Sequence, residues 1–346
     1  MTARSLGQYY KVNGDTLERT YKYYLSGYLS WDNRSHADRY LVFPENFGPK
    51  MSIDETSTKD GELFTILSNR DRHCGKGSIA AIVRGTKIED VATALLKVPD
   101  DIRKVVGEVT MDFSSSMAAI VDIAFPWAYR VLDRFHMQKI AIDAVSNLRN
   151  KHKREAMAAE AKARKEFKQL QEAKRRHMKR KYKIYIDGHP LPRVKPFIPE
   201  RLPNGDTVPE LLTRSRHLLT MSADKWTDTQ KARAEILFKR YPDIKQAYGL
   251  SHSLRVIFNN KNATRESART SLAEWYQKVY KFKNEDLSTL ADTLQSREDE
   301  VLNFFISRST NASAEALNTK IKAFRAQLRG IIDLKFFLFR LTRIYA

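Results

Sequence analysis

The sequence has 346 residues, of which 42% are hydrophobic, enough to bury a sizeable core and more than one structural unit. Lysine and arginine number 61 against 41 acidic residues, which gives a net charge of +20. The single cysteine, Cys74, excludes an internal disulfide framework and argues against a cysteine-based zinc site. No apolar run reaches the roughly 18 residues of a transmembrane helix, and the N-terminus lacks a signal-peptide core. We therefore expect a soluble, cytoplasmic protein with no membrane partner.

The positive charge is concentrated in two segments rather than spread along the chain. Residues 149–201 contain 18 basic and 6 acidic residues, and residues 308–346 contain 8 basic and 2 acidic residues. Clustered positive charge is typical of proteins that bind a polyanion. We favour a nucleic-acid partner over the alternative, a basic soluble protein without one.

The first 30 residues predict two short helices. Residues 3–10 form the first, residues 11–14 a turn, and Asp15 or Thr16 caps a second helix that continues through residue 28. This resembles the last two helices of a helix-turn-helix, and its mixture of aromatic and basic side chains suits a DNA-facing surface. That mixture comprises Arg19, Tyr21, Lys22, Tyr23, Tyr24 and Tyr28. An amphipathic helix packed on the following domain is an equally good interpretation.

After a predicted linker at 31–50, the pattern becomes that of a mixed sheet. Helices are predicted at 89–97 and 114–124. Predicted strands occupy 51–57, 62–68, 78–83, 108–113 and 129–132. Three consecutive strands followed by alternating helices and strands are the order of an RNase H-like sheet. The predicted fold class is therefore α/β, with an RNase H-like core in a chain that is helix-rich overall.

The remainder of the chain is predicted to be almost entirely helical. A long helix runs from about 134 to 183, and residues 187–209 hold six of the eleven prolines and form an irregular connector. Further helices are predicted at 210–221, 227–239, 243–258, 264–281, 284–306, 313–329 and 333–345. The predicted division is 1–30 partial helix-turn-helix, 31–50 linker, 51–150 first part of the core, 151–307 basic helix, connector and helical insertion, and 308–346 final core helices.

Two aspartates occupy adjacent positions in the predicted sheet. Asp54 lies within the first predicted strand and Asp112 at the end of the fourth, and these strands are neighbours at the centre of an RNase H-like sheet. Two carboxylates so close would repel each other, and a divalent metal removes that repulsion. Mg²⁺ binds carboxylates together with water and phosphate oxygens, as in two-metal phosphoryl-transfer sites.

A third carboxylate, Glu315, opens a late amphipathic helix. Its apolar stripe at 4-3-4 spacing consists of Leu317, Ile321, Phe324 and Leu328, which should pack on the sheet. A neighbouring face carries Glu315, Asn318, Lys322, Arg325 and Arg329 at 3-4-3-4 spacing. A carboxylate beside amide and basic groups suits a metal next to a phosphate backbone, but spacing alone favours an ordinary solvated helix face.

Three sequence blocks carry a resemblance to a known family. The blocks are MSIDETSTKDGELFTIL, VTMDFSSSMAAIVDIAFPWAYRVLDRFHMQK and STNASAEALNTKIKAFRAQLRG. In this order they resemble the DDE transposases of the ISL-three insertion-sequence family, especially a Bacteroidetes-type subgroup. The resemblance covers residues from about 50 to 346. It implies a bacterial, nucleoid-associated enzyme that cleaves and transfers DNA strands at insertion-sequence ends, using two Mg²⁺ or Mn²⁺ ions.

The resemblance also assigns roles to single residues. The catalytic, metal-binding triad falls on Asp54, Asp112 and Glu315. A D-x-x-H signature falls on Asp133 and His136, near the site, although His136 has a structural alternative as a cap at the strand-to-helix junction. Further residues that the motif places near the metal or DNA are Asn318 and Lys322, with Thr at position 310 as a mild departure.

The basic segments then become predicted contacts to double-stranded DNA, both the element's ends and the target. The predicted DNA-binding residues are Lys174, Arg175, Arg176, Lys179, Arg180, Lys181, Arg325 and Arg329. A solvated charged helix is the alternative for the first six. Trp226 and Trp275 could stack on a displaced base, but core packing is favoured for both.

The sequence departs from the family at its N-terminus. It has neither the zinc-finger-like segment nor the complete helix-turn-helix that family members usually carry. Either the chain is truncated or a separately encoded partner supplies DNA-end recognition, and we expect a homodimer or higher oligomer on DNA. Two other functions stay open: a domesticated nuclease that cuts without joining, and a catalytically inactive DNA-binding derivative.

Overall fold

The computed structural model describes residues 3–57, 61–181 and 195–346. The chain divides into two compact units. The first unit comprises the residues up to 137 together with 262–269 and 294–346, and the second comprises 138–261 with 270–293. No helix in the described ranges is long and apolar enough to cross a membrane.

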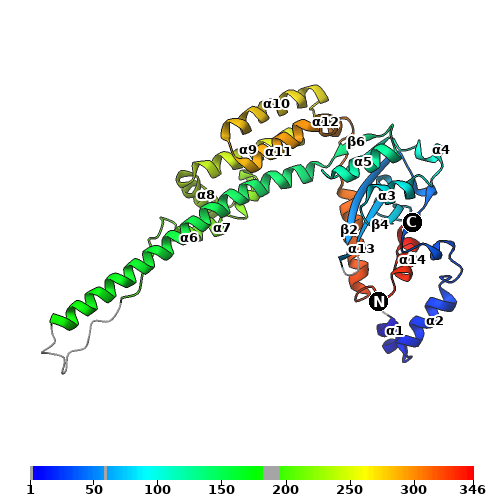
Figure 1. Cartoon of the computed structure of the whole chain (residues 1–346), viewed down its shortest axis with the longest axis horizontal. Coiled ribbons are helices and arrows are strands. Elements are labelled where there is room, and N and C mark those ends of the chain that lie inside the picture. Colours follow the sequence, from blue (N-terminus) through cyan, green and yellow to red (C-terminus); the bar gives the residue numbers. More distant parts are fainter. Residues whose placement is uncertain (1–2, 58–60, 182–194) are drawn as a thin grey trace. The chain divides into compact units, whose positions relative to one another are not determined.

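A six-stranded mixed sheet forms the centre of the first unit (Figure 1). Its strands are β1 (Tyr40–Val42), β2 (Lys50–Ser57), β3 (Leu63–Asn69), β4 (Ile79–Arg84), β5 (Glu108–Met111) and β6 (Tyr129–Leu132). They lie in the order β1-β4-β3-β2-β5-β6. Strands β1, β4, β3 and β2 pair antiparallel, whereas β5 runs parallel to β2 and to β6.

All five predicted strands are confirmed to within two residues at each end. Edge strand β1 was not predicted, because it has only three residues and lies in the segment expected to be a linker. It nevertheless pairs with β4, so part of that segment belongs to the sheet. The prediction that the strands bearing the two aspartates are adjacent is also confirmed, since β2 pairs with β5.

Helices cover the sheet of the first unit on both faces. The helices of this unit in sequence order, not all of which contact the sheet, are α1 (Ala3–Tyr10), α2 (Gly14–Thr20), α3 (Ile88–Leu95), α4 (Asp100–Arg103), α5 (Ser115–Ala124), α12 (Glu298–Ser307), α13 (Ala312–Gln327) and α14 (Leu334–Tyr345). The single helix predicted at 284–306 is wrong. It is two helices, because Arg297 leaves the helical conformation at φ −120°, ψ 33°.

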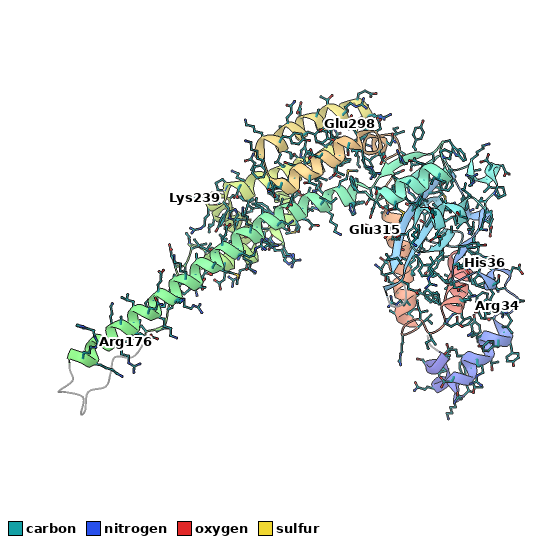
Figure 2. All side chains as sticks on the ribbon, in the orientation of Figure 1. Arg34, His36, Arg176, Lys239, Glu298 and Glu315 are labelled. Atoms are coloured by element: carbon teal, nitrogen blue, oxygen red, sulfur yellow. The ribbon has the colours of Figure 1, made fainter. Side chains whose placement is uncertain are left out.

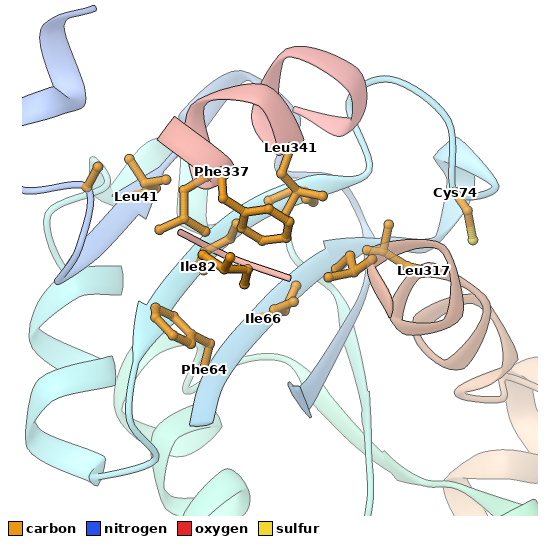
Figure 3. Packing of buried hydrophobic residues seen from close by; sticks show 13 residues of the cluster. Leu41, Phe64, Ile66, Cys74, Ile82, Leu317, Phe337 and Leu341 are labelled. Carbon is orange, nitrogen blue, oxygen red and sulfur yellow. The ribbon is translucent and has the colours of Figure 1, made fainter. Parts of the chain in front are cut away.

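The predicted apolar stripe of α13 is confirmed. Leu317 and Ile321 are buried in a cluster with Ile66 of β3, and Phe324 and Leu328 pack against it. Phe337 and Leu341 of α14 complete the same cluster, and Figure 3 shows the side chains of both helices meeting those of the strands. Successive side chains of a strand point to opposite faces, so Met51 and Ile53 of β2 point away from α13, whereas Ser52 and Asp54 point toward it.

The N-terminal helices differ in detail from the prediction. Asn13 caps α2 by accepting from the Thr16 N–H, so the expected cap at Asp15 or Thr16 is wrong. The helix ends at Thr20 and a π-helix follows over Tyr21–Leu25. The turn between α1 and α2 leaves no room for a side chain at Gly7, because a Cβ there would lie 2.6 Å from the Val12 carbonyl oxygen.

One residue of the predicted DNA-facing mixture is a core residue instead. Tyr28 is 6% exposed and packs on Phe336 and Phe339 of α14. Lys22 forms an ion pair with Asp333 at 2.6 Å. Tyr21, Tyr23 and Tyr24 are exposed. Of the four tyrosines in the predicted DNA-facing mixture, these three therefore remain at the surface.

The second unit is entirely helical in its described residues. It contains most of α6 (Arg134–Lys181), then α7 (Val208–Arg214), α8 (Asp228–Arg240), α9 (Pro242–Asn259), and parts of α10 (Arg265–Phe282) and α11 (Glu285–Ser296). The helix predicted at 210–221 is shorter, because α7 ends at Arg214 and a 3-10 turn follows at Leu218–Thr220. Of the proline-rich connector, residues 187–194 lie outside the described part.

Trp226 and Trp275 both pack against residues of the second unit. Trp275 is 1% exposed and donates from Nε1 to the Leu250 carbonyl. Trp226 donates to the Leu218 carbonyl and packs against Phe238. The prediction of core packing is confirmed for Trp275, whereas Trp226 packs against its neighbours but is only half-buried.

Candidate active site

The register of two parallel strands brings Asp54 and Asp112 together. Lys50 pairs with Glu108, and Ser52 pairs with Thr110. Continuing this register by two residues places Asp54 opposite Asp112, which directly follows the last residue of β5. Because side chains alternate along a strand, Asp54 points to the face that bears α13, and the charge of Asp112 acts on it.

Helix α13 is attached to the same face through Asn318. Its Nδ2 donates to Asp54 Oδ2 at 2.7 Å, and a weaker contact of 3.4 Å reaches the Glu55 carbonyl. Glu315 lies one turn earlier on α13 and is exposed (Figure 2). A hydrogen bond to an ionised carboxylate contributes about 1.5–3 kcal/mol, so Asn318 holds the helix beside Asp54.

The carboxylates interact electrostatically. Burial, followed by the charges of Asp112 and Glu315, raises the pKa of Asp54 from 3.8 to about 6, although a hydrogen bond from the Glu55 N–H opposes the shift. The ionised form of Asp54 is therefore disfavoured in the metal-free protein. A cation bound beside it would relieve both the burial penalty and the repulsion.

His136 lies beside the second aspartate. Its Nδ1 is 3.4 Å from Asp112 Oδ2, and its ring is 5.7 Å from the Phe113 ring. Asp133, three residues earlier, is 1% exposed and accepts from the His136 N–H at 3.3 Å. Burial raises the pKa of Asp133. The capping role considered for His136 thus belongs to Asp133, whereas the His136 side chain faces Asp112.

Sequence reasoning missed one residue that supports this edge of the sheet. Arg297 Nη1 donates to the Phe113 carbonyl at 2.8 Å, and its guanidinium also binds Glu300. Glu300 in turn forms a salt bridge with Arg130 of β6 at 3.0 Å. No sequence signal pairs Arg297 with a carbonyl 184 positions earlier.

The donor set suits a divalent metal, but it is not gathered as a ready-made cage. Within residues 3–57, 61–181 and 195–346, no group of three or more His, Cys, Asp or Glu side chains is close enough to hold an ion. Three carboxylates with one raised pKa are nevertheless the hard oxygen donors that Mg²⁺ prefers, and Mg²⁺ commonly retains waters and phosphate oxygens as further ligands. A metal bound by these carboxylates therefore stays a prediction.

The comparison with known families identifies the chain. A family model described as "Transposase", of the ISL-three DDE type, matches residues 51–341. The chain belongs to this transposase family. It is thus a protein of DNA transposition and recombination, of the kind insertion sequences encode, and its substrate is DNA. Comparisons with curated proteins and with solved structures gave no match.

The predicted DNA-contacting residues of the transposase fall in both units. On α13, Lys322 is exposed one turn beyond Asn318 and Arg325 is half-buried, whereas Arg329 lies past the helix end at φ 57°. On α6, residues 172–180 are all exposed, including Arg176 (Figure 2). Lys181 ends the helix, but its side chain is outside the described part. These positions suit phosphate contact, and their role stays a prediction.

The shifted Asp54 predicts how stability of the metal-free transposase depends on pH. Between the unfolded pKa of 3.8 and the folded value of about 6, the folded state binds the extra proton. The free energy of unfolding therefore falls as pH rises through this window, by at most about 3 kcal/mol. Melting temperatures at about pH 5 and about pH 7.5 measure this difference, and Mg²⁺ should raise the midpoint more at the higher pH.

Asp54→Asn is the matched control for this pH effect, because it keeps the side-chain shape and cannot ionise. The variant should melt higher than the parent at about pH 7.5 and lose the Asp54 part of the pH dependence. If the melting temperatures of the parent and of Asp54→Asn change identically with pH, the role given to Asp54 is contradicted.

Proposed function

We propose that the transposase cleaves DNA at insertion-sequence ends and joins the freed ends to target DNA, with Asp54, Asp112 and Glu315 as its metal-binding catalytic residues. The observation that carries this proposal is the pairing of β2 with β5, the strand that directly precedes Asp112, together with the Asn318 contact, which brings α13 beside Asp54. The raised pKa of Asp54, caused partly by the charges of Asp112 and Glu315, supports it.

We also propose that the first unit is an RNase H-like core, interrupted before α13 by a helical insertion. In support, β4-β3-β2 form an antiparallel meander, and β5 and β6 continue parallel to β2. The second unit is inserted between segments of the first, as expected of such an insertion.

Two divalent ions bound to the three carboxylates would stabilise the attacking and leaving oxygens of an in-line displacement at phosphorus. In cleavage, a water oxygen bonds to phosphorus, the bond to the 3′-oxygen breaks, and that oxygen leaves as a hydroxyl with a proton. In joining, the freed 3′-hydroxyl attacks a target phosphate and a target 3′-hydroxyl leaves. Phosphorus is transferred between oxygens in both steps, so a covalent enzyme intermediate is unnecessary.

The side chains around the carboxylates have supporting tasks in this scheme. Asn318 keeps α13 beside Asp54, and His136 is placed to donate to Asp112 or to a phosphate oxygen there. Lys322 and Arg325, farther along α13, are suited to contact the DNA backbone.

The test is a joining assay with DNA that carries the element's own ends. The transposase should release a strand with a 3′-hydroxyl and insert it into a target plasmid in Mg²⁺ or Mn²⁺, and chelation should stop both reactions. Cleavage without joining would indicate the nuclease alternative. DNA binding without either reaction would indicate an inactive derivative and defeat the proposal.

The basic residues at the end of α6 predict strongly salt-dependent DNA binding. Each phosphate contact lowers the logarithm of affinity by about 0.9 per logarithm of salt concentration. Replacing six of these residues with glutamine should therefore make the slope of log affinity against log salt concentration shallower by up to about 5. The same change should weaken binding to all DNA sequences alike. The six are Lys174, Arg175, Arg176, Lys179, Arg180 and Lys181.

The matched control removes the same number of charges from α8, α10 and the turn after α10 in the second unit. Its targets are Lys231, Lys239, Arg240, Lys278, Lys281 and Lys283, all exposed. Fluorescence anisotropy at several salt concentrations compares the two variants. Equal slopes in both would show that the α6 residues form a solvated surface rather than a DNA contact.

A further inference from the structure

A chain of three buried polar residues crosses the core next to the predicted active site. Ser52 of β2, Asn311 before α13 and Asp133 after β6 are each no more than 1% exposed. Ser52 Oγ donates to Asn311 Oδ1 at 2.7 Å, and the Asn311 N–H donates to Asp133 Oδ1 at 3.1 Å. We name this group the Ser52–Asn311–Asp133 node.

Asn311 does not use its side chain in the usual way for its position. It is the N-cap residue of α13, where an asparagine side chain ordinarily accepts from an N–H of the first turn. Here it makes no such bond, and its oxygen accepts from the Ser52 hydroxyl instead. The chain thus forgoes a capping bond of about 1 kcal/mol and ties the helix start to the sheet.

The node touches the backbone next to each predicted catalytic carboxylate. Ser52 precedes Asp54 by two residues and points to the same face of β2. The Asp133 N–H donates to the Met111 carbonyl at 2.9 Å, and Met111 directly precedes Asp112. The Glu315 N–H donates to the Asn311 carbonyl at 3.0 Å. Three elements that carry the carboxylates therefore meet in one buried hydrogen-bonded group.

We infer that Asn311 is a positioning residue of the transposase, which sets the placement of Glu315 against Asp54 and Asp112, and that Ser52 is its anchor on the sheet. This inference rests on the proposed function. Buried hydrogen bonds fix relative positions because breaking one leaves an unpaired polar group. Misplacement of a catalytic group by about 1 Å can cost about 10²-fold in rate.

The sharpest test replaces the anchor, which carries no group that the reaction needs. Ser52→Ala removes the hydroxyl and leaves Asn311 Oδ1 without its donor. Ser68→Ala is the matched control, because Ser68 pairs with Ser52 across β2 and β3, is 2% exposed, and bonds only weakly, at 3.4 Å, to the Ser52 carbonyl. Both variants lose one buried hydroxyl from adjacent strands, but only one loses the connection to α13.

We expect kcat for joining to fall about 10- to 100-fold in Ser52→Ala, with the Kd for end DNA unchanged and a melting temperature below that of Ser68→Ala, because Asn311 Oδ1 loses its donor. Ser68→Ala should keep near wild-type kcat, and Ser52→Thr, which retains the hydroxyl, should recover most of the loss. Asn311→Ala and the Ser52→Ala/Asn311→Ala double variant complete a double-mutant cycle, in which urea unfolding measures the stability of each variant. Because the two side chains bond to each other, their effects on the free energy of unfolding should be non-additive.

Two results would overturn the inference. One is equal kcat for Ser52→Ala and Ser68→Ala, and the other is additive unfolding effects of Ser52→Ala and Asn311→Ala. A wild-type chain that joins no DNA would instead count against the proposed function, and the unfolding cycle would still decide whether the node couples β2 to α13.

Discussion

The Asp112→Asn transposase is expected to bind end DNA with near wild-type affinity and to lose cleavage and joining by about 10³-fold or more. Asparagine has the shape of aspartate, so the contact with His136 and the end of β5 should persist. What disappears is the negative charge that a divalent ion needs. Cleavage of a 5′-labelled end fragment, followed on a denaturing gel, measures the effect.

Asp122→Asn is the control for this variant. Asp122 lies on α5 and forms an exposed salt bridge with Arg130 at 2.6 Å, so its loss removes an acidic charge from the same unit but not from the site. It should cleave at nearly the wild-type rate. Full activity of Asp112→Asn, or equal loss in both variants, would contradict the assignment of Asp112.

Glu315→Gln is expected to have a similarly large effect, with cleavage and joining reduced by about 10³-fold. This result would separate a metal ligand from an ordinary solvated helix face, because glutamine suits an exposed helix position equally well. The melting temperature should change little, since the exposed side chain contributes little to packing.

Glu55→Gln is the matched control for Glu315. Glu55 follows Asp54 directly and is exposed, so this variant also exchanges an exposed acid for its amide close to Asp54. It should retain activity within a few-fold of wild type. If Glu315→Gln behaves like Glu55→Gln, then Glu315 is a surface residue and the third carboxylate must be sought elsewhere.

The sheet was predictable because its strands carry local signals. Short β-rich runs between turn residues locate β2 to β6, and the expectation that β2 neighbours β5 came from the strand order of an RNase H-like sheet. Strand β1 is too short for a periodic pattern, and the helix break at Arg297 has neither glycine nor proline to announce it. These features depend on tertiary contacts that no sequence window contains.

The candidate site was predictable in unequal measure. The assignment of Asp54 and Asp112 rests on strand order and on the family's sequence blocks, and the pairing of β2 with β5 agrees with the expected strand order. Glu315 rested on the family resemblance, because an acidic residue on a solvated helix face is common. Ser52 and Arg297 were missed, since their partners lie 259 and 184 positions away in the sequence. The alternation of Ser52, Asp54 and Thr56 along β2 was the one local signal available for Ser52.

The central claim, that three carboxylates form one divalent-metal site on DNA, is tested most directly by Mn²⁺ binding. Electron paramagnetic resonance of the complex with end DNA counts bound ions without requiring turnover. Wild type and Glu55→Gln should bind Mn²⁺ alike, whereas Asp54→Asn, Asp112→Asn and Glu315→Gln should each bind it about tenfold or more weakly. Unchanged Mn²⁺ binding in any of these three variants would contradict its assignment as a metal ligand.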